Sequence, residues 1–175
     1  DELIPKAEKI EFNSASDALM ALDNGKIDAF PTDESLYYAM RWEGKNYSIV
    51  EESMATSTYG MIFGKGANQD LRAELNAFLS DNKETVAVLE AKWFSEKEPT
   101  EFMSYDDLTG ESGTLRIGVC SSVKPFVYMK DGRLTGYDIE ILISFAREYG
   151  YKLDFEDTLF ASVLTGVSMG TYDIG

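Results

Sequence analysis

Three stretches of sequence decide the fold: Leu115-Arg-Ile-Gly-Val119, Ile139-Glu-Ile-Leu-Ile-Ser-Phe-Ala-Arg-Glu-Tyr149 and Tyr151-Lys-Leu-Asp-Phe155. The first and the third are short and alternate apolar with polar residues, which is typical of strands. The middle stretch has the apolar spacing of an amphipathic helix, and Gly150 follows it as a cap. A strand, a helix and a strand in this order predict an α/β fold, in which Rossmann-like lobes carry a mixed sheet flanked by helices.

Further patterns lie on both sides of this predicted helix. Phe126–Asp138 is predicted to form a hairpin around Lys130-Asp131-Gly132, because Asp-Gly is a strong turn signal. We expect a helix over 161–169 and the start of another strand at Tyr172-Asp-Ile174.

The first hundred residues alternate between strand and helix patterns. Short strands are predicted at 8–12, 27–30, 47–50 and 59–63. A capping box, Ser14-Ala-Ser-Asp17, opens a helix that Gly25 closes, and a second short helix is predicted over 36–42. A longer helical region over 68–93 is expected to break near Asp81-Asn82.

The periodicity disappears between residues 95 and 112. This stretch holds six acidic residues and one lysine: Glu96, Glu98, Glu101, Asp106, Asp107, Glu111 and Lys97. Because like charges repel one another, we interpret 95–112 as an extended acidic linker.

The composition excludes several classes of function. The chain has 175 residues, with 16 lysines and arginines against 31 aspartates and glutamates, and its formal net charge is −15. Such a surface repels phosphate backbones and anionic lipids, so nucleic acid is not an expected partner. The chain has no histidine, which removes the commonest general base and the commonest zinc ligand. Its single cysteine cannot form an internal disulfide, and no apolar run reaches the roughly 20 residues that cross a bilayer.

One pattern occurs twice: a helix, a capping glycine and an aspartate that opens a strand, at Gly25 to Asp28 and at Gly170 to Asp173. Two related lobes would give this repetition, although any helix–strand unit can produce it as well. The chain does not begin with methionine, and we expect it to be a piece of a longer protein.

A series of motifs spans the last part of the chain: Thr114-Leu-Arg-Ile-Gly-Val119, Lys124-Pro-Phe-Val-Tyr128, Gly136-Tyr-Asp-Ile-Glu-Ile141, Tyr151-Lys-Leu-Asp-Phe155, Leu159-Phe160 and Gly170-Thr-Tyr-Asp-Ile174. In this order they resemble the opening third of a type II periplasmic substrate-binding protein of the polar amino-acid-binding family (extracellular solute-binding protein family 3). The first part of the chain is similar to the ending of the same family, in Lys9-Ile-Glu-Phe12, Gly25-Lys-Ile-Asp-Ala29, Asp33, Tyr59-Gly60 and Lys92-Trp-Phe94.

The resemblance therefore implies an incomplete fold in permuted order, as in tandem binding domains fused to amino-acid ABC transporter permeases. Residues 1–94 resemble the C-terminal part of a first domain, with 1–53 as half of a second lobe and 59–94 as the return to the first lobe. Residues 95–112 are then the linker, and 113–175 open a second domain.

By the same resemblance, the protein is extracytoplasmic, in the periplasm or at the outer face of the cell membrane. It would capture a polar amino acid between two lobes for an ABC permease, either a separate subunit or a fused domain. The ligand-sensing region of a receptor kinase or cyclase uses the same domains and stays open as an alternative.

A carboxylate-dependent hydrolase is a third reading, because two carboxylates can hydrolyse glycosides without histidine. No motif positions such a pair, and Asp106-Asp107 is interpreted as a solvated charge run. Gly64-Lys-Gly66 lacks the spacing of a phosphate-binding loop. We expect no enzymatic activity, no catalytic residues, no cofactor and no metal.

Two side chains are the main candidates for ligand contact. Asp33 follows a predicted strand, and ligands of open α/β sheets gather at the carboxyl ends of strands. The resemblance pairs Asp33 with the ligand's α-ammonium, and the alternative is a surface turn. Phe160 matches the family's aromatic residue that lies over the ligand's side chain, and the alternative is core packing. Asp28 and Asp173 are interpreted as structural residues at strand starts.

The loop Cys120-Ser-Ser-Val123 departs from the family, in which many members have an aspartate at the position of Cys120 and an aromatic residue at that of Val123. Ser121 and Ser122 remain as hydroxyl groups for the ligand. Of Phe126 and Tyr128, alternation is expected to send one side chain into the core. The signature Tyr137-Asp-Ile-Glu140 is expected at the junction of hairpin and helix, with Asp138 near the helix N-terminus.

In the family, the closing segment packs back onto the first lobe. We therefore expect 59–94 and 113–175 to build one composite lobe, within a chain or swapped between the chains of a homo-oligomer, with Trp93 near Ile117 and Ile141. The family's arginine for the ligand's carboxylate follows the strand that starts at Tyr172, beyond Gly175. Binding by these 175 residues alone is therefore expected to be weak or absent.

Overall fold

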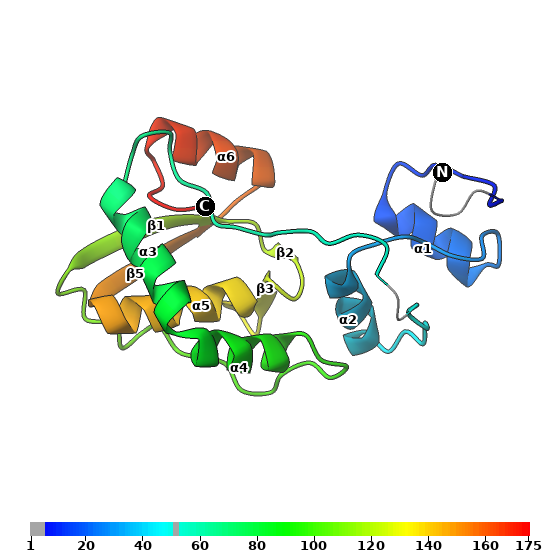
Figure 1. Cartoon of the computed structure of the whole chain (residues 1–175), viewed down its shortest axis with the longest axis horizontal. Coiled ribbons are helices and arrows are strands. Elements are labelled where there is room, and N and C mark those ends of the chain that lie inside the picture. The colour runs from blue at the N-terminus through cyan, green and yellow to red at the C-terminus, as the bar shows by residue number, and fades with distance from the viewer. Residues whose placement is uncertain (1–5, 51–52) are drawn as a thin grey trace.

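The computed structural model describes residues 6–50 and 53–175. The elements are, in order, α1 (Ala15–Asp23), α2 (Glu34–Trp42), α3 (Gln69–Asp81), α4 (Lys83–Trp93), β1 (Gly113–Val119), β2 (Ser122–Val123), β3 (Val127–Lys130), β4 (Arg133–Thr135), α5 (Tyr137–Tyr149), β5 (Tyr151–Asp157) and α6 (Phe160–Met169). They form two bodies (Figure 1): a larger lobe with the strands and α3 to α6, and a smaller body with α1 and α2.

The centre of the lobe is a small mixed sheet. β1 and β5 pair as parallel strands, with Gly113 opposite Tyr151 and Val119 opposite Asp157. On its other side, β1 pairs in parallel with the last residues of the chain, through Ile117 and Ile174. Ile62 and Gly175 then exchange two backbone N–H···O bonds of 2.7 and 3.0 Å, as an antiparallel pair does. The predicted α/β class with a mixed sheet is confirmed.

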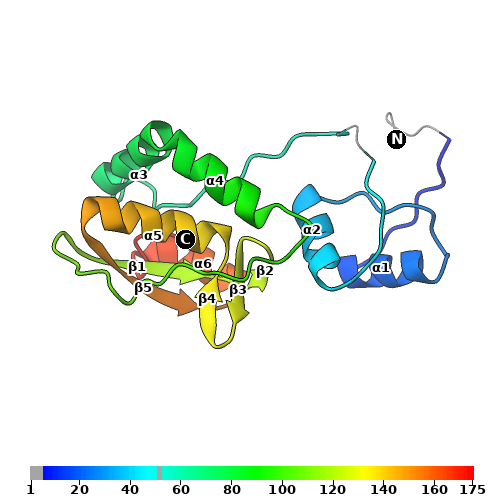
Figure 2. The same ribbon diagram turned by 90° about the horizontal axis from the view of Figure 1, so that it is seen from below.

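Helices cover both faces of this sheet. α5 and α6 lie on opposite sides of β1 and β5 (Figure 1), and Figure 2 shows α3 and α4 lying over α5. The β3–β4 hairpin turns at Asp131 and Gly132, whose φ angles of 50° and 78° are both positive. A type I′ turn requires this conformation at both central residues, which explains why Asp-Gly predicted the hairpin correctly.

The core of the lobe is shared between the two segments that were expected to build it. Trp93, at the end of α4, is 0% exposed and packs in the same cluster as Ile117 and Ile141. The Phe78 ring of α3 lies 5.7 Å from the Phe145 ring of α5, between ring centroids. The expected contact of Trp93 is thus confirmed within a single chain, and the origin of the two segments in two different domains stays a prediction.

Glu140 of α5 is the polar centre of this core and is 0% exposed. Its carboxylate accepts two bonds from Lys92 Nζ, at 2.7 and 2.8 Å, one from Trp93 Nε1 at 2.9 Å and one from the Met103 N–H at 2.9 Å. A buried charge is tolerated when its hydrogen-bonding capacity is satisfied in this way. The carboxylate therefore joins α4, the segment 95–112 and α5 at one point.

The segment 95–112 contains no helix or strand and packs against the lobe, while its role as a linker between two domains stays a prediction. Asp106 pairs with Arg133 at 2.7 Å, and Asp107 pairs with Arg147 at 3.1 Å. Both side chains stay mostly exposed, at 67% and 63%, so they are solvated as predicted, and each also pairs with an arginine. Cations of the lobe offset the repulsion that composition alone suggested, so the segment lies along the lobe.

Most helix predictions are confirmed. The Ser14 hydroxyl caps α1 as predicted, by accepting a hydrogen bond from the Asp17 N–H at 3.1 Å, but the Asp17 carboxylate accepts from that hydroxyl at 2.8 Å instead of from a backbone amide. The predicted break in the long helical region lies at Asn82, between α3 and α4. The helices predicted over 36–42 and 161–169 correspond to α2 and α6.

The strands predicted at 8–12, 27–30 and 47–50 do not form, and 59–63 pairs only at Ile62. These segments are largely exposed, with Ile10 at 52%. A strand needs a neighbour that completes its ladder of N–H and C=O groups, and alternation along one segment carries no information about that neighbour.

Candidate ligand-binding edge

The parallel strands β1 and β5 end side by side, so the segments that follow them meet at one edge of the sheet. β1 leads into the loop 120–123, and β5 leads to α6, whose first residue is Phe160. The Thr158 N–H donates to the Val119 carbonyl at 2.9 Å, so the chain just after β5 is bonded to the last residue of β1. Ligands of open α/β sheets bind outside such carboxyl ends. We call this region, residues 120–123 and 157–160, the strand edge.

Asp157 fixes the loop of the strand edge. Its carboxylate accepts a 2.9 Å bond from the Ser121 N–H and a 2.6 Å bond from Ser121 Oγ. Ser122 Oγ lies 3.1 Å from Cys120 Sγ, so both serines are engaged within the edge. Sequence reasoning missed Asp157 because the strand was expected to end at Phe155. An acidic residue just before Leu159-Phe160 was the available signal.

Phe160 opens α6 and is 63% exposed. It packs in neither hydrophobic cluster of the lobe, so the alternative of core packing does not hold. Its aromatic face is therefore free to meet a ligand, three residues beyond the end of β5 at Asp157.

Asp33 lies in the smaller body, directly before α2. Its backbone is extended, and its side chain makes no capping bond to the helix, so the exposed carboxylate remains available. Burial first, and then the neighbouring Asp33 carboxylate, raise the pKa of Tyr59. The Tyr59 ring in turn lies 4.8 Å from that of Phe126, between ring centroids. Asp33 is therefore near the junction between the two bodies.

The structure brings Ser121, Ser122 and Phe160 to one edge but does not join Asp33 to them. Within 6–50 and 53–175, no hydrogen bond or ion pair links the Asp33 side chain to any of these three residues. The four residues predicted to contact a ligand thus lie in two groups on two bodies.

Trp42 connects α2 to the lobe. Its ring lies 6.3 Å from Trp93 and 6.2 Å from Tyr128, between ring centroids, and its Nε1 donates to the Ser95 carbonyl at 2.8 Å. This contact buries Tyr128, while Phe126 is buried against other aromatic rings. The prediction that only one of Phe126 and Tyr128 would be core is therefore wrong.

The signature at the start of α5 has the junction role that was predicted. The N–H groups of Tyr137 and Asp138 donate to the carbonyls of Pro125 and Phe126, at 3.0 and 3.1 Å. Burial raises the pKa of Asp138 to about 6. Burial, followed by the nearby charge of Glu90, raises the pKa of Tyr137 to about 12.

Asp173 is structural, as predicted. Its carboxylate accepts bonds from Arg116, at 2.9 Å from the backbone N–H and at 3.1 and 2.7 Å from the guanidinium. Although burial acts in the opposite direction, these bonds lower the pKa of Asp173. Asp28 is exposed and begins no strand, because the strand predicted at 27–30 does not form, so its predicted role at a strand start is wrong.

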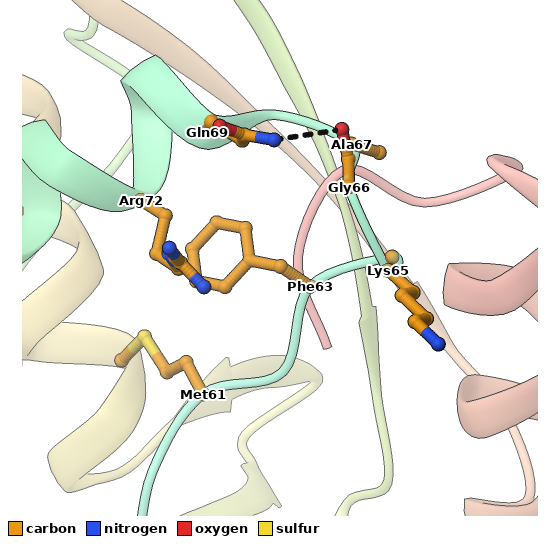
Figure 3. A pocket seen from close by; sticks show the side chains of 8 residues that line it. Met61, Phe63, Lys65, Gly66, Ala67, Gln69 and Arg72 are labelled. Atoms are coloured by element: carbon orange, nitrogen blue, oxygen red, sulfur yellow. Dashed lines mark hydrogen bonds between the residues drawn. The ribbon is translucent and has the colours of Figure 1, made fainter.

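A hollow of about 360 Å³ lies between the 61–67 segment and α3 (Figure 3). It is lined by Met61, Phe63, Gly64, Lys65, Gly66, Ala67, Gln69 and Arg72. Asn68 Nδ2, beside it, donates to the Asp173 carbonyl at 3.2 Å, where the last parallel strand begins. This hollow therefore lies toward the edge opposite to Ser121 and Phe160.

Residues 6–50 and 53–175 lack two further features. These residues hold no group of three or more acidic or cysteine side chains arranged to bind a metal ion. No helix in the same ranges combines the length and the apolar character needed to cross a bilayer.

The segment that contains the strand edge is similar to a known protein family. Residues 115–175 match the sequence model of the bacterial extracellular solute-binding proteins, family 3. Residues 115–175 are therefore similar to the solute-binding proteins of this family. The match begins in β1 and includes Ser121, Ser122, Asp157 and Phe160.

Two proteins similar to this chain are named for the amino acids that they bind. The chain is 34% identical over 102 residues to the ABC transporter glutamine-binding protein GlnH of Bacillus subtilis (strain 168). The aligned residues make up 57% of this chain and 37% of GlnH. A solved structure of the L-cystine solute receptor of Neisseria gonorrhoeae, unliganded and open, has 34% identity and a TM-score of 0.34 over 40% of this chain and 30% of the receptor.

A second solved structure, of an ancestral cyclohexadienyl dehydratase, has 31% identity and a TM-score of 0.33 over 41% of this chain and 31% of that protein. The chain thus spans less than two fifths of the length of each of these three relatives.

Proposed function

We propose that this chain is the amino-acid-binding part of an extracytoplasmic solute-binding protein that serves an ABC uptake transporter. The strand edge carries the proposal: within the segment that matches the family 3 model, two serine hydroxyls and the exposed Phe160 ring lie together beyond the ends of β1 and β5. A few polar groups beside an aromatic face are what a small polar ligand needs. The likeness to a glutamine-binding protein of an ABC transporter supports the same ligand class.

Each candidate residue has a distinct role in this proposal. Phe160 lies over the ligand's side chain, and Ser121 and Ser122 provide hydrogen-bonding oxygens. Asp33 pairs with the α-ammonium group when the smaller body closes onto the strand edge. Closure excludes water, and a charge-assisted hydrogen bond is stronger in the lower dielectric that results. Ligand capture without catalysis is part of the proposal.

The proposal extends to the context of the chain. Residues 1–94 and 113–175 come from two consecutive binding domains, and the ligand is delivered to an ABC permease, as a subunit or a fused domain. The family description as extracellular proteins supports a location in the periplasm or at the outer face of the cell membrane. The packing of both segments into one core is compatible with a domain exchange of this kind.

An NMR titration of the chain with polar amino acids tests this function, because it measures dissociation constants in the millimolar range. We expect binding that is millimolar or weaker, and at least about tenfold weaker in Asp33→Ala, since losing a charge-assisted partner costs about 2–5 kcal/mol. Asp28→Ala, which removes an exposed carboxylate five residues earlier, should bind like the unaltered chain. Equal binding by the two variants would contradict the role of Asp33.

A further inference from the structure

Asp157 occupies a position that the proposed function does not yet explain. It is the last residue of β5, opposite Val119 of β1, and its exposed carboxylate lies at the strand edge. Both of its oxygens are engaged by Ser121, one by the N–H and one by the hydroxyl. Phe160 follows three residues later. Asp157 thus connects the two segments that carry the candidate ligand contacts.

We propose that Asp157 is a positioning residue for the 120–123 loop and that it selects against ligands with acidic side chains. The inference rests on the proposed function and concerns which polar amino acids the strand edge accepts. Neutral and cationic side chains with N–H groups are favoured over the carboxylates of aspartate and glutamate. Two independent properties of Asp157, its hydrogen bonds and its charge, lead to this selectivity.

The hydrogen bonds determine what Ser121 offers to a ligand. A serine hydroxyl has one hydrogen to donate and two lone pairs to accept with. The hydrogen of Ser121 is directed to Asp157 Oδ2 over 2.6 Å, so only the acceptor capacity of Ser121 Oγ remains. A ligand amide or ammonium group can donate to this oxygen. A ligand carboxylate can only accept hydrogen bonds, so its oxygen would face Ser121 Oγ with no hydrogen between the two atoms.

The charge of Asp157 acts in the same direction. The ion pairs found in residues 6–50 and 53–175 do not include Asp157, and its two hydrogen-bond donors belong to an uncharged residue. Its negative charge is therefore not offset by a cation of the described chain. The formal net charge of −15 adds a longer-range repulsion of anions. An acidic side chain at the strand edge meets like charge at short and at long range.

The positioning role is tested first without any ligand, by hydrogen exchange of the Ser121 amide in the full chain. We expect Asp157→Ala to speed this exchange at least about tenfold, because the only partner of the N–H within the described residues is removed. Asp157→Asn keeps an oxygen acceptor and should retain part of the protection. Asp154→Asn, the same change three residues earlier on β5, is the matched control and should leave the rate unchanged. An unchanged rate in Asp157→Ala, with the other amides at their native shifts, would overturn the positioning role.

The selectivity is tested by NMR titration of the same proteins with glutamine, lysine and glutamate. We expect glutamine and lysine to bind at least about tenfold more tightly than glutamate, and this ratio to fall several-fold in Asp157→Asn but not in Asp154→Asn. Glutamate bound as tightly as glutamine would overturn the inference and leave the proposed function in place. Binding of none of the three amino acids would overturn the proposed function together with this inference, whatever the exchange rate of Ser121.

Discussion

At the scale of single residues, Glu140 explains how a strongly acidic chain keeps a carboxylate in its core. The carboxylate is surrounded by donors from two segments, α4 and 95–112, and one of these donors, Lys92, also neutralises its charge. Removing one member of a buried ion pair leaves the other charge without compensation, which is far more costly than losing a surface pair.

We predict that Glu140→Gln lowers the free energy of unfolding by about 3–5 kcal/mol, because the Lys92 ammonium loses its carboxylate partner. Urea unfolding followed by far-UV circular dichroism measures this loss. Glu148→Gln makes the same change on the exposed side of α5 and should alter the free energy by less than about 0.5 kcal/mol. Equal effects of the two substitutions would contradict the central position of Glu140.

The raised pKa of Asp138 makes the free energy of unfolding depend on pH. Burial raises its pKa from 3.8 to about 6, so the folded state holds this proton more tightly than the unfolded state does. The stabilising contribution is therefore complete below about pH 4 and is lost as the pH rises through 6. The free energy of unfolding of Asp138→Asn, relative to the unaltered chain, should increase by about 2–3 kcal/mol between pH 4 and pH 7.5. A difference that stays constant across a series of urea titrations at these pH values would refute this.

At the scale of elements, the connection from the hairpin to α5 depends on Gly136. Its φ is +135°, and an added Cβ would lie 2.0 Å from the Phe126 carbonyl oxygen, so any side chain forces the backbone to move. Gly132, in the hairpin turn, also has a positive φ of +78°, but a Cβ there meets nothing within 4 Å. The same substitution therefore has two different costs within one hairpin.

We predict that Gly136→Ala destabilises the chain by more than about 3 kcal/mol, from both backbone strain and the clash, whereas Gly132→Ala costs about 1 kcal/mol from the positive φ alone. Thermal unfolding of the two variants, measured side by side, separates the two effects. Similar melting temperatures for both variants would show that α5 does not need its close approach to Phe126.

The elements that could be predicted from the sequence are those with local causes. The helix cap at Ser14, the break at Asn82 and the Asp131-Gly132 turn each act within a few residues, and all three appear in the structure. The segments 8–12 and 27–30 were predicted as strands from the same kind of local pattern. Strand formation depends on a partner elsewhere in the chain, and for these segments the described residues provide none.

The candidate site, too, could be predicted only in part from the sequence. The resemblance of 114–174 to a known family led to Ser121, Ser122 and Phe160, which the fold brings to one edge. The bonds of Asp157 to Ser121 cross 36 residues of sequence and depend on the register of β1 against β5. Neither the spacing nor the composition contained that register, so the role of Asp157 required the structure.

At the scale of the whole molecule, the core of the lobe is built from two segments that are distant in sequence. β1, α5 and β5 supply one side of the core, and the other side comes from α3 and α4, including Trp93. A piece consisting of 113–175 exposes this apolar face to water, where burial would otherwise contribute about 25 cal/mol per Å².

We predict that residues 57–175 unfold cooperatively when expressed without the smaller body, and that residues 113–175 alone do not. Near-UV circular dichroism during urea titration distinguishes the two pieces, because fixed aromatic packing such as that of Phe78 against Phe145 gives a signal that disappears on unfolding. A cooperative transition of 113–175 alone, at the denaturant midpoint of the longer piece, would contradict the composite core.

The most direct measurement of where this protein binds its ligand is a map of backbone amide shifts during titration of the full chain with glutamine. Binding at the strand edge predicts that the amides of Ser121, Ser122 and Phe160 shift together and with one dissociation constant. The 360 Å³ hollow around Phe63 and Arg72, toward the opposite edge of the sheet, should stay unchanged. Shifts confined to that hollow, or no shifts even at concentrations of glutamine and lysine far above millimolar, would contradict amino-acid binding at the strand edge.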